Sequence, residues 1–105
     1  MVYYYYMKTQ EKPWTDWLEN DELAFVRRFI LASGSLKALA QVYGVTYPTI
    51  RLRLDRLIQK FHVIDDQQIT SDFERLLRTK FADGKIDADT LKSLLQAYRT
   101  EKETP

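Results

Sequence analysis

The sequence predicts an all-α fold, a small helical domain in which a helix-turn-helix is followed by a C-terminal helical hairpin. Apolar residues recur at helical spacing along most of the chain. Three such stretches end at Gly34, Gly44 and Gly84, and glycine is the residue that most readily adopts the left-handed conformation closing a helix. No long run typical of a strand interrupts this pattern. With 105 residues, the chain is long enough to bury a hydrophobic core without disulfides.

The composition and the distribution of apolar residues exclude several classes of protein. The chain has no cysteine, which excludes a disulfide framework and a thiolate zinc site. No apolar segment approaches the ~18 residues that a membrane-spanning helix needs, and the N-terminus lacks the pattern of a secretory signal. We therefore expect a cytoplasmic protein that does not contact membranes. The basic residues are concentrated, because residues 36–62 contain five Lys or Arg and one Asp, a net charge of +4, whereas the whole chain carries +1.

Residues 1–19 form an aromatic N-terminal arm whose conformation the sequence leaves open. The run VYYYYM has high β-propensity and is compatible with a short strand, an arm exchanged between subunits or a disordered leader. Its tyrosines suit packing or oligomer contacts better than base stacking, because no basic residue interrupts them. After Pro13, the side chains of Trp14, Trp17 and Leu18 are predicted to cover the core.

A three-helix helix-turn-helix domain is predicted for residues 20–62. Its first helix begins at a cap formed by Asn20 or Asp21 and ends near Ser33. The buried stripe of this helix is predicted to consist of Leu23, Phe25, Val26, Phe29 and Ile30.

The next two helices have the spacing of a DNA-binding helix-turn-helix. Ser35 is placed to cap a helix over residues 36–43, and Gly44 makes the tight turn that follows. Thr46 then caps a second helix over about residues 47–61. The predicted inward-facing residues are Ala40 and Val45 around the turn, and Ile50, Leu54, Leu57, Ile58 and Phe61 on the second helix.

The second helix is expected to present a basic face, as a recognition helix does. The predicted DNA-binding residues are Lys37, Thr46, Tyr47, Thr49, Arg51, Leu52, Arg53, Arg56 and Lys60. Thr49 and Leu52 are expected to meet base edges, and the arginines to meet phosphates or guanine. Asp55 either accepts a hydrogen bond from cytosine or orients Arg51 or Arg56.

The last third of the chain is predicted to contain a connector over residues 63–70, an antiparallel helical hairpin over residues 71–100 and a frayed tail over residues 101–105. Ser71 and Asp87 are placed as N-caps of the two hairpin helices. We expect the hairpin, with the tyrosine arm as a further candidate, to form a homodimer, because one small domain contacts few base pairs.

The stretch from Gly34 to Ile58 resembles a bacterial family of uncharacterised proteins of unknown function regarded as transcriptional regulators, which carry a phrase similar to GSLKALAQVYGVSYPTVRxRLDRLI. Its second helix also resembles the promoter-reading C-terminal domain of extracytoplasmic-function sigma factors. The positions that match the sigma-factor pattern are Thr49, Ile50, Arg51, Arg53, Leu54 and Arg56. The resemblance implies transcriptional regulation through binding of double-stranded DNA. Longer members of the first family place a cysteine-rich zinc ribbon before this domain, and a ribbon is absent from this sequence.

We expect no enzymatic activity and no cofactor. His62 is the only histidine, and the sequence has no nucleophile–base set, phosphate-binding glycine loop or metal-ligand cluster. No small-molecule substrate is evident. The main alternative is a protein–protein interaction module, in which the basic helix binds a partner from the transcription machinery and an exposed Leu52 marks the interface.

Overall fold

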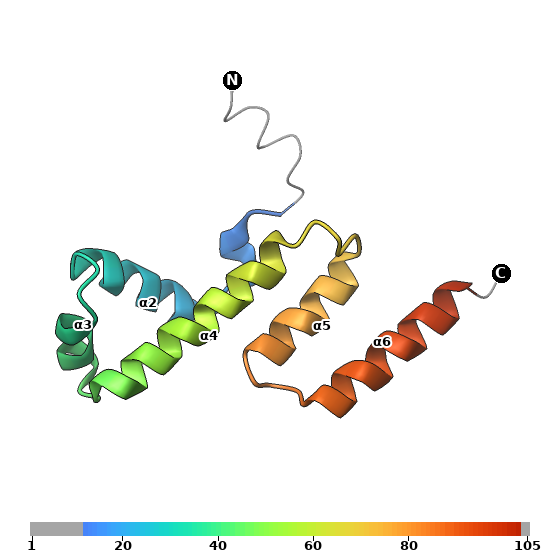
Figure 1. The fold of residues 1–105 in the computed structure, drawn as a ribbon. Coiled ribbons are helices and arrows are strands. Elements are labelled where there is room, and N and C mark those ends of the chain that lie inside the picture. Colours follow the sequence, from blue (N-terminus) through green and yellow to red (C-terminus); the bar gives the residue numbers. More distant parts are fainter. Residues whose placement is uncertain (1–11, 104–105) are drawn as a thin grey trace, which may run out of the picture.

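The computed structural model describes residues 12–103, and Figure 1 shows their arrangement. The described elements are a 3-10 helix η1 (Trp14–Trp17) and the α-helices α2 (Asn20–Leu31), α3 (Leu36–Tyr43), α4 (Tyr47–Asp65), α5 (Asp72–Ala82) and α6 (Ala88–Glu103). There is no strand among these residues, so the predicted all-α class is confirmed. The tyrosine run of the arm lies outside the described residues. Within them, no helix combines the length and apolarity needed to span a membrane.

Side-chain caps begin the helices at the positions predicted for α3, α4, α5 and α6. Ser35 Oγ accepts from the Ala38 amide (3.1 Å), Thr46 Oγ1 from Thr49 (3.4 Å), Ser71 Oγ from Glu74 (3.3 Å) and Asp87 Oδ1 from Thr90 (2.7 Å). The N-cap predicted for α2, Asn20 or Asp21, is wrong by one or two residues. Its N-cap is Glu19, whose amide donates to Glu22 Oε1 (2.9 Å) in a reciprocal capping box.

The helix-turn-helix has its own core, formed by α2, α3, α4 and the segment before α2. Its buried residues are Leu18, Phe25, Leu39, Ala40, Ile50 and Leu57. The predicted aromatic cover is also present, since Trp17 is buried and the Trp14 ring lies 5.3 Å from that of Phe61.

Three residues predicted to face inward are exposed instead. Ile30 has 68% of its surface exposed, because the core lies on the side of Phe25 and Phe29, and Ile30 is rotated by about 100° from Phe29. Ile58 lies at the edge of the inward stripe of α4, and Val45 at the outer edge of the turn, so both remain partly in solvent.

Two predicted boundaries also differ. α4 continues to Asp65, so the connector is shorter than predicted, and α6 continues to Glu103 where fraying was expected from residue 101. The extension of α4 is stabilised by Arg75 of α5. Its guanidinium donates to the last carbonyl groups of the helix, those of Val63 (2.9 Å) and Ile64 (2.6 Å), and to that of Asp66 (3.1 Å).

The hairpin extends the molecule sideways instead of closing over the first core. Figure 1 shows α4, α5 and α6 side by side, with α5 in the middle. The molecule measures 55 × 42 × 19 Å, and its radius of gyration is 16.7 Å, compared with about 13 Å for a compact domain of 100 residues. A second small core lies between α5 and α6, around Leu77, Leu91 and Leu95. The predicted hairpin is therefore confirmed. Its two helices lie in a single layer that is one helix thick.

A buried ion cluster joins the hairpin to the helix-turn-helix. Lys60 of α4 is only 1% exposed, and its Nζ lies 2.6 Å from Glu22 Oε1 of α2 and 2.7 Å from Asp83 Oδ2 at the end of α5. Burial opposes the charged form of Lys60, but hydrogen bonds with Asp83 and Glu22 outweigh it and raise the pKa of the amine above its ordinary value. The cluster therefore fixes α5 against both α2 and α4.

Candidate nucleic-acid interface

The two helices of the motif approach closely through a turn of three residues. Gly44 has φ +66°, a left-handed conformation that closes α3, and the Val45 amide donates to the Ala40 carbonyl (3.0 Å). Leu39 and Ala40 are buried against α4. This is the geometry of a helix-turn-helix, in which the first helix supports the second.

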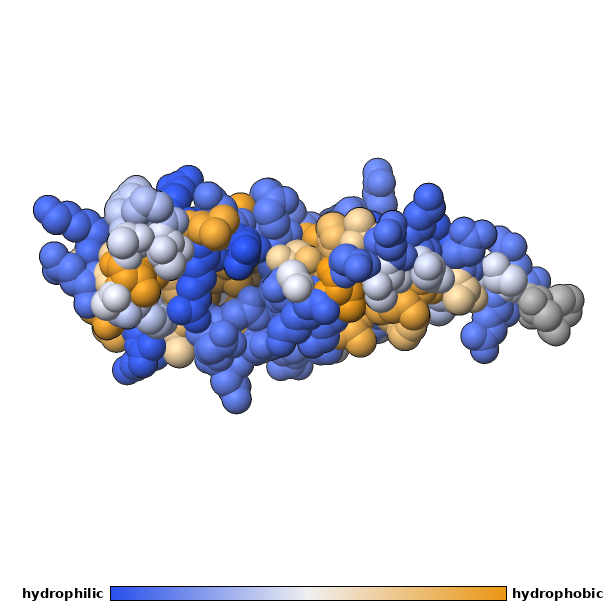
Figure 2. Space-filling model, turned by 90° about the horizontal axis from the view of Figure 1, so that it is seen from below, coloured by the Kyte–Doolittle hydropathy of each residue, from blue (hydrophilic) through white to orange (hydrophobic). Residues whose placement is uncertain are grey.

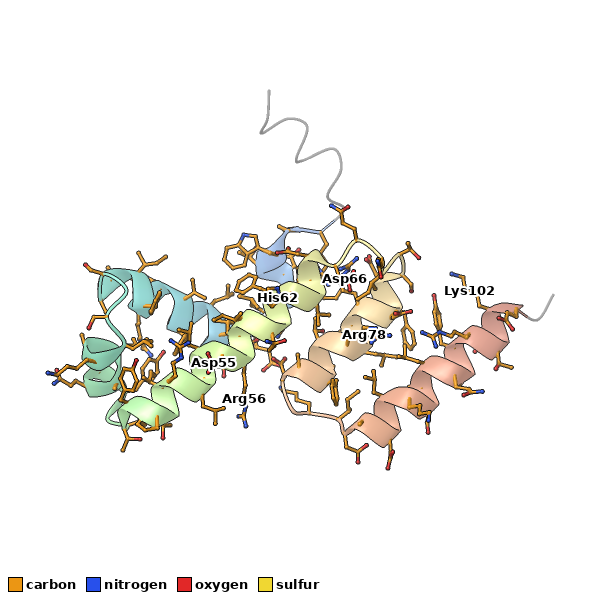
Figure 3. All side chains as sticks on the ribbon, in the orientation of Figure 1. Asp55, Arg56, His62, Asp66, Arg78 and Lys102 are labelled. Atoms are coloured by element: carbon orange, nitrogen blue, oxygen red, sulfur yellow. The ribbon has the colours of Figure 1, made fainter. Side chains whose placement is uncertain are left out.

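The N-terminal half of α4, which begins beside α3 at one end of the molecule (Figure 1), forms a presented face. We define this presented face as Tyr47, Thr49, Arg51, Leu52 and Arg56, all of which are exposed. Leu52 has 52% of its surface exposed and is an apolar residue among polar ones on this face. Figure 3 shows Arg56 extending away from the α4 ribbon.

Two local contacts order this face. Arg51 Nε lies 3.3 Å from Asp55 Oδ1, one helical turn later. Asp55 is therefore in contact with Arg51, one of the two arginines that it was predicted to orient. The Thr46 and Thr49 hydroxyl groups are 3.0 Å apart, so the cap also holds the Thr49 side chain. Lys37 of α3 is exposed as well, on the supporting helix.

Arg53 is brought into the packing of the domain. Its guanidinium lies 4.9 Å from the ring centres of Phe25 and Tyr43, and its Nη2 donates to the Asp21 carbonyl oxygen (3.4 Å). A carboxylate oxygen of Asp21 is 3.7 Å away. These contacts tie α4 to α2 and α3, which makes Arg53 a supporting residue beside the presented face.

The prediction that Lys60 binds DNA is wrong. The amine is buried and held by two carboxylates, so it cannot reach a phosphate from its position. Its partners are 38 and 23 residues away in sequence and could not be inferred from local spacing. A signal was present in the helix phase, because Lys60 follows Leu57 by three residues and precedes Ile64 by four, which places it on the inward side.

The part of the chain that contains the helix-turn-helix is similar to a known protein family. Residues 18–64 match the family model described as "Domain of unknown function (DUF2089)-HTH". The predicted likeness to an uncharacterised family with a helix-turn-helix is confirmed at this level. The matched segment runs from Leu18 to Ile64 and leaves out α5 and α6. No curated protein and no solved structure matches the chain. The resemblance to sigma factors, and the zinc ribbon of longer relatives, stay predictions.

Proposed function

We propose that this protein binds specific sequences in double-stranded DNA through α4 and regulates transcription, acting by binding and not by catalysis. The observation that carries the proposal is the presented face of α4, held outward by α3 in a helix-turn-helix and offering Arg51, Leu52 and Arg56 together. The matched family description, which contains a helix-turn-helix, supports the same function.

The residues of the presented face have separate roles in this proposal. Arg51, oriented by Asp55, donates to the acceptor edge of guanine, and Leu52 contacts a thymine methyl group. Arg56 and Lys37 bind phosphates on either side of the groove and set the orientation of α4. The segment from residue 47 to residue 56 is about 15 Å long, enough for one stretch of major groove.

We propose further that the DNA-bound form is a homodimer joined through the hairpin. Domains normally bury apolar residues between two layers, and the hairpin has one. Three large apolar residues of the hairpin, Phe73, Leu76 and Leu94, are each at least 40% exposed. Figure 2 shows apolar side chains in the central part of the molecule, where α5 and α6 lie. A second copy supplies the missing layer and a second α4 for a second half-site.

Selection of bound duplexes from a random library tests the proposal. The full chain is expected to enrich one sequence, repeated at a fixed spacing if the dimer forms. Affinity for the selected duplex is expected to fall steeply with salt. Arg51→Ala and Arg56→Ala are expected to weaken binding, and Arg27→Ala, which removes an exposed cation from α2, serves as the matched control.

Two results would contradict the proposal. The first is no retention of any duplex at low salt, and the second is equal affinity for the Arg51, Arg56 and Arg27 variants. For the dimer, sedimentation is expected to give twice the chain mass, and Leu94→Lys is expected to shift it to the monomer. A monomer at the concentration that saturates DNA would refute the hairpin as the dimer contact.

A further inference from the structure

A groove lies beside the presented face of α4, on its side toward the hairpin. One wall contains Leu52, Asp55, Arg56 and Val63 of α4, and the other contains Arg78 and Phe81 of α5 with Leu91 of α6. The groove has a volume of about 550 Å³, within the range of about 300–1,000 Å³ that small-molecule sites occupy. Phe81 and Leu52 each have more than 40% of their surface exposed, so apolar area on both walls faces solvent.

The groove is elongated and mainly apolar. Leu52 and Val63 mark its extent along α4, and eleven residues of helix correspond to about 16 Å. Leucine, valine and phenylalanine side chains offer no hydrogen bonds. From Arg56 to Val63 the groove follows seven residues of helix, about 10 Å, so an occupant that begins at Arg56 needs a narrow apolar body of about this length.

The charges around the groove favour an anionic group on that occupant. The carboxylate of Asp55 in the groove is already paired with Arg51 (3.3 Å), and Arg78 Nε is paired with Glu74 Oε2 (2.9 Å). Among residues 12–103, Arg56 has no ion-pair partner, and it lies beside Leu52 at the end of the groove nearer the turn. A guanidinium binds a carboxylate through two parallel hydrogen bonds, and such pairs are stronger than neutral ones.

We propose that this groove binds an elongated apolar carboxylate, with the carboxylate on Arg56 and the apolar body along Val63, Phe81 and Leu91. The ligand occupies Arg56, which belongs to the presented face, so a bound ligand excludes DNA. This second part rests on the proposed function. The binding site itself does not, because it is defined by the groove alone.

Amide chemical-shift mapping with octanoate, kept below its micelle concentration, tests the site on the full chain. Saturable shifts are expected for residues that line the groove. Octylammonium has the same apolar body with the opposite charge and is expected to bind at least about tenfold more weakly. Equal binding of the two compounds, or shifts that do not saturate, would overturn the proposed site.

Two substitutions separate the groove from other apolar surface. Ala82 lines the groove, so Ala82→Phe fills it and is expected to abolish octanoate binding; Ala97→Phe, on an exposed position of α6, is the matched control. If Ala82→Phe does not fold, Gln59→Glu places a carboxylate on the exposed groove wall and is expected to weaken octanoate about tenfold. Unchanged octanoate binding in a folded variant would refute the site.

Competition on the selected duplex tests the regulatory part. Octanoate is expected to release DNA from the unmodified chain and not from Ala82→Phe, which retains the presented face. Duplex that stays bound at saturating octanoate would overturn the exclusion of DNA by ligand. Failure to retain any duplex would instead overturn the proposed function, and the amide shifts would still decide whether the groove binds a carboxylate.

Discussion

Replacing Lys60 with methionine is expected to destabilise the fold strongly, because it breaks the ion cluster that joins the hairpin to the helix-turn-helix. Methionine keeps most of the apolar stem but removes the amine that lies between Glu22 and Asp83. The side chains of those two residues are 17% and 11% exposed, so their carboxylates would face each other with little solvent and no cation. Removing one partner of a buried ion pair typically costs about 3–5 kcal/mol.

That cost is large for a chain of this size. Stabilities of small domains are about 5–15 kcal/mol, and about 1 kcal/mol corresponds to 4–8 °C in Tm for 60–100 residues. We therefore expect Lys60→Met to lower the urea midpoint strongly, measured by circular dichroism at neutral pH. Lys92→Met, on an exposed position of α6, is the matched control and is expected to have little effect.

Removing the two carboxylates that Lys60→Met leaves without a cation is expected to restore part of the lost stability. The triple variant Glu22→Gln, Lys60→Met, Asp83→Asn contains no buried charge at this site and is expected to be more stable than Lys60→Met alone. Because the pKa of Lys60 is raised, its contribution to the free energy of unfolding is complete below the pKa of an unfolded lysine and is lost as pH rises through the higher folded value. A loss below about 1 kcal/mol in Lys60→Met would refute the view that the cluster joins the two units.

Three further predictions concern local stability. Arg75→Met is expected to cost about 2 kcal/mol in urea unfolding, because the last carbonyl groups of α4 lose a charged donor, and unchanged hydrogen exchange at Val63 to Asp66 would contradict this. Gly44→Ala is expected to cost about 1 kcal/mol from its left-handed φ alone, since nothing lies within 4 Å of the added methyl group; a neutral effect on Tm would contradict it. The Thr90 amide lowers the pKa of Asp87, so the charged carboxylate of this cap stabilises the fold. The stability difference between the unmodified chain and Asp87→Ala is therefore expected to be complete above the pKa of an unfolded aspartate and to be lost as pH falls through the lower folded value. A stability difference that persists in strong acid would contradict this.

The parts of the fold that depend on neighbouring residues were predictable from the sequence. The caps at Ser35 and Thr46 and the glycine turn between them require only residues three or four positions apart, so their local chemistry determines them. Burial was less predictable where two helix faces have similar hydrophobicity. Phe25 and Ile30 both fit an apolar stripe, and only the positions of α3 and α4 decide that Phe25 is buried.

The surroundings of a candidate site residue were not predictable from the sequence where its side chain has a distant partner. Arg51 and Arg53 are two residues apart and chemically identical, yet Arg51 is oriented outward by Asp55 whereas Arg53 packs on Phe25. No local rule separates them, because the aromatic ring comes from a different helix. Lys60 shows the same limit, since a basic residue on a basic helix is paired inward by carboxylates from α2 and from the end of α5.

The distribution of cations along α4 divides this helix into two parts with different tasks. Up to Arg56, its arginines either belong to the presented face or support it. Beyond Arg56, the one lysine is turned inward to hold the hairpin, and Arg75 covers the carbonyl end. A longer DNA-binding helix would need outward cations in this second part, and among its residues only His62 offers an exposed basic group. If α4 binds DNA as proposed, recognition is therefore confined to about 15 Å of helix. Specificity then depends on a second copy, at a spacing set by the hairpin that Lys60 and Arg75 fix to α4.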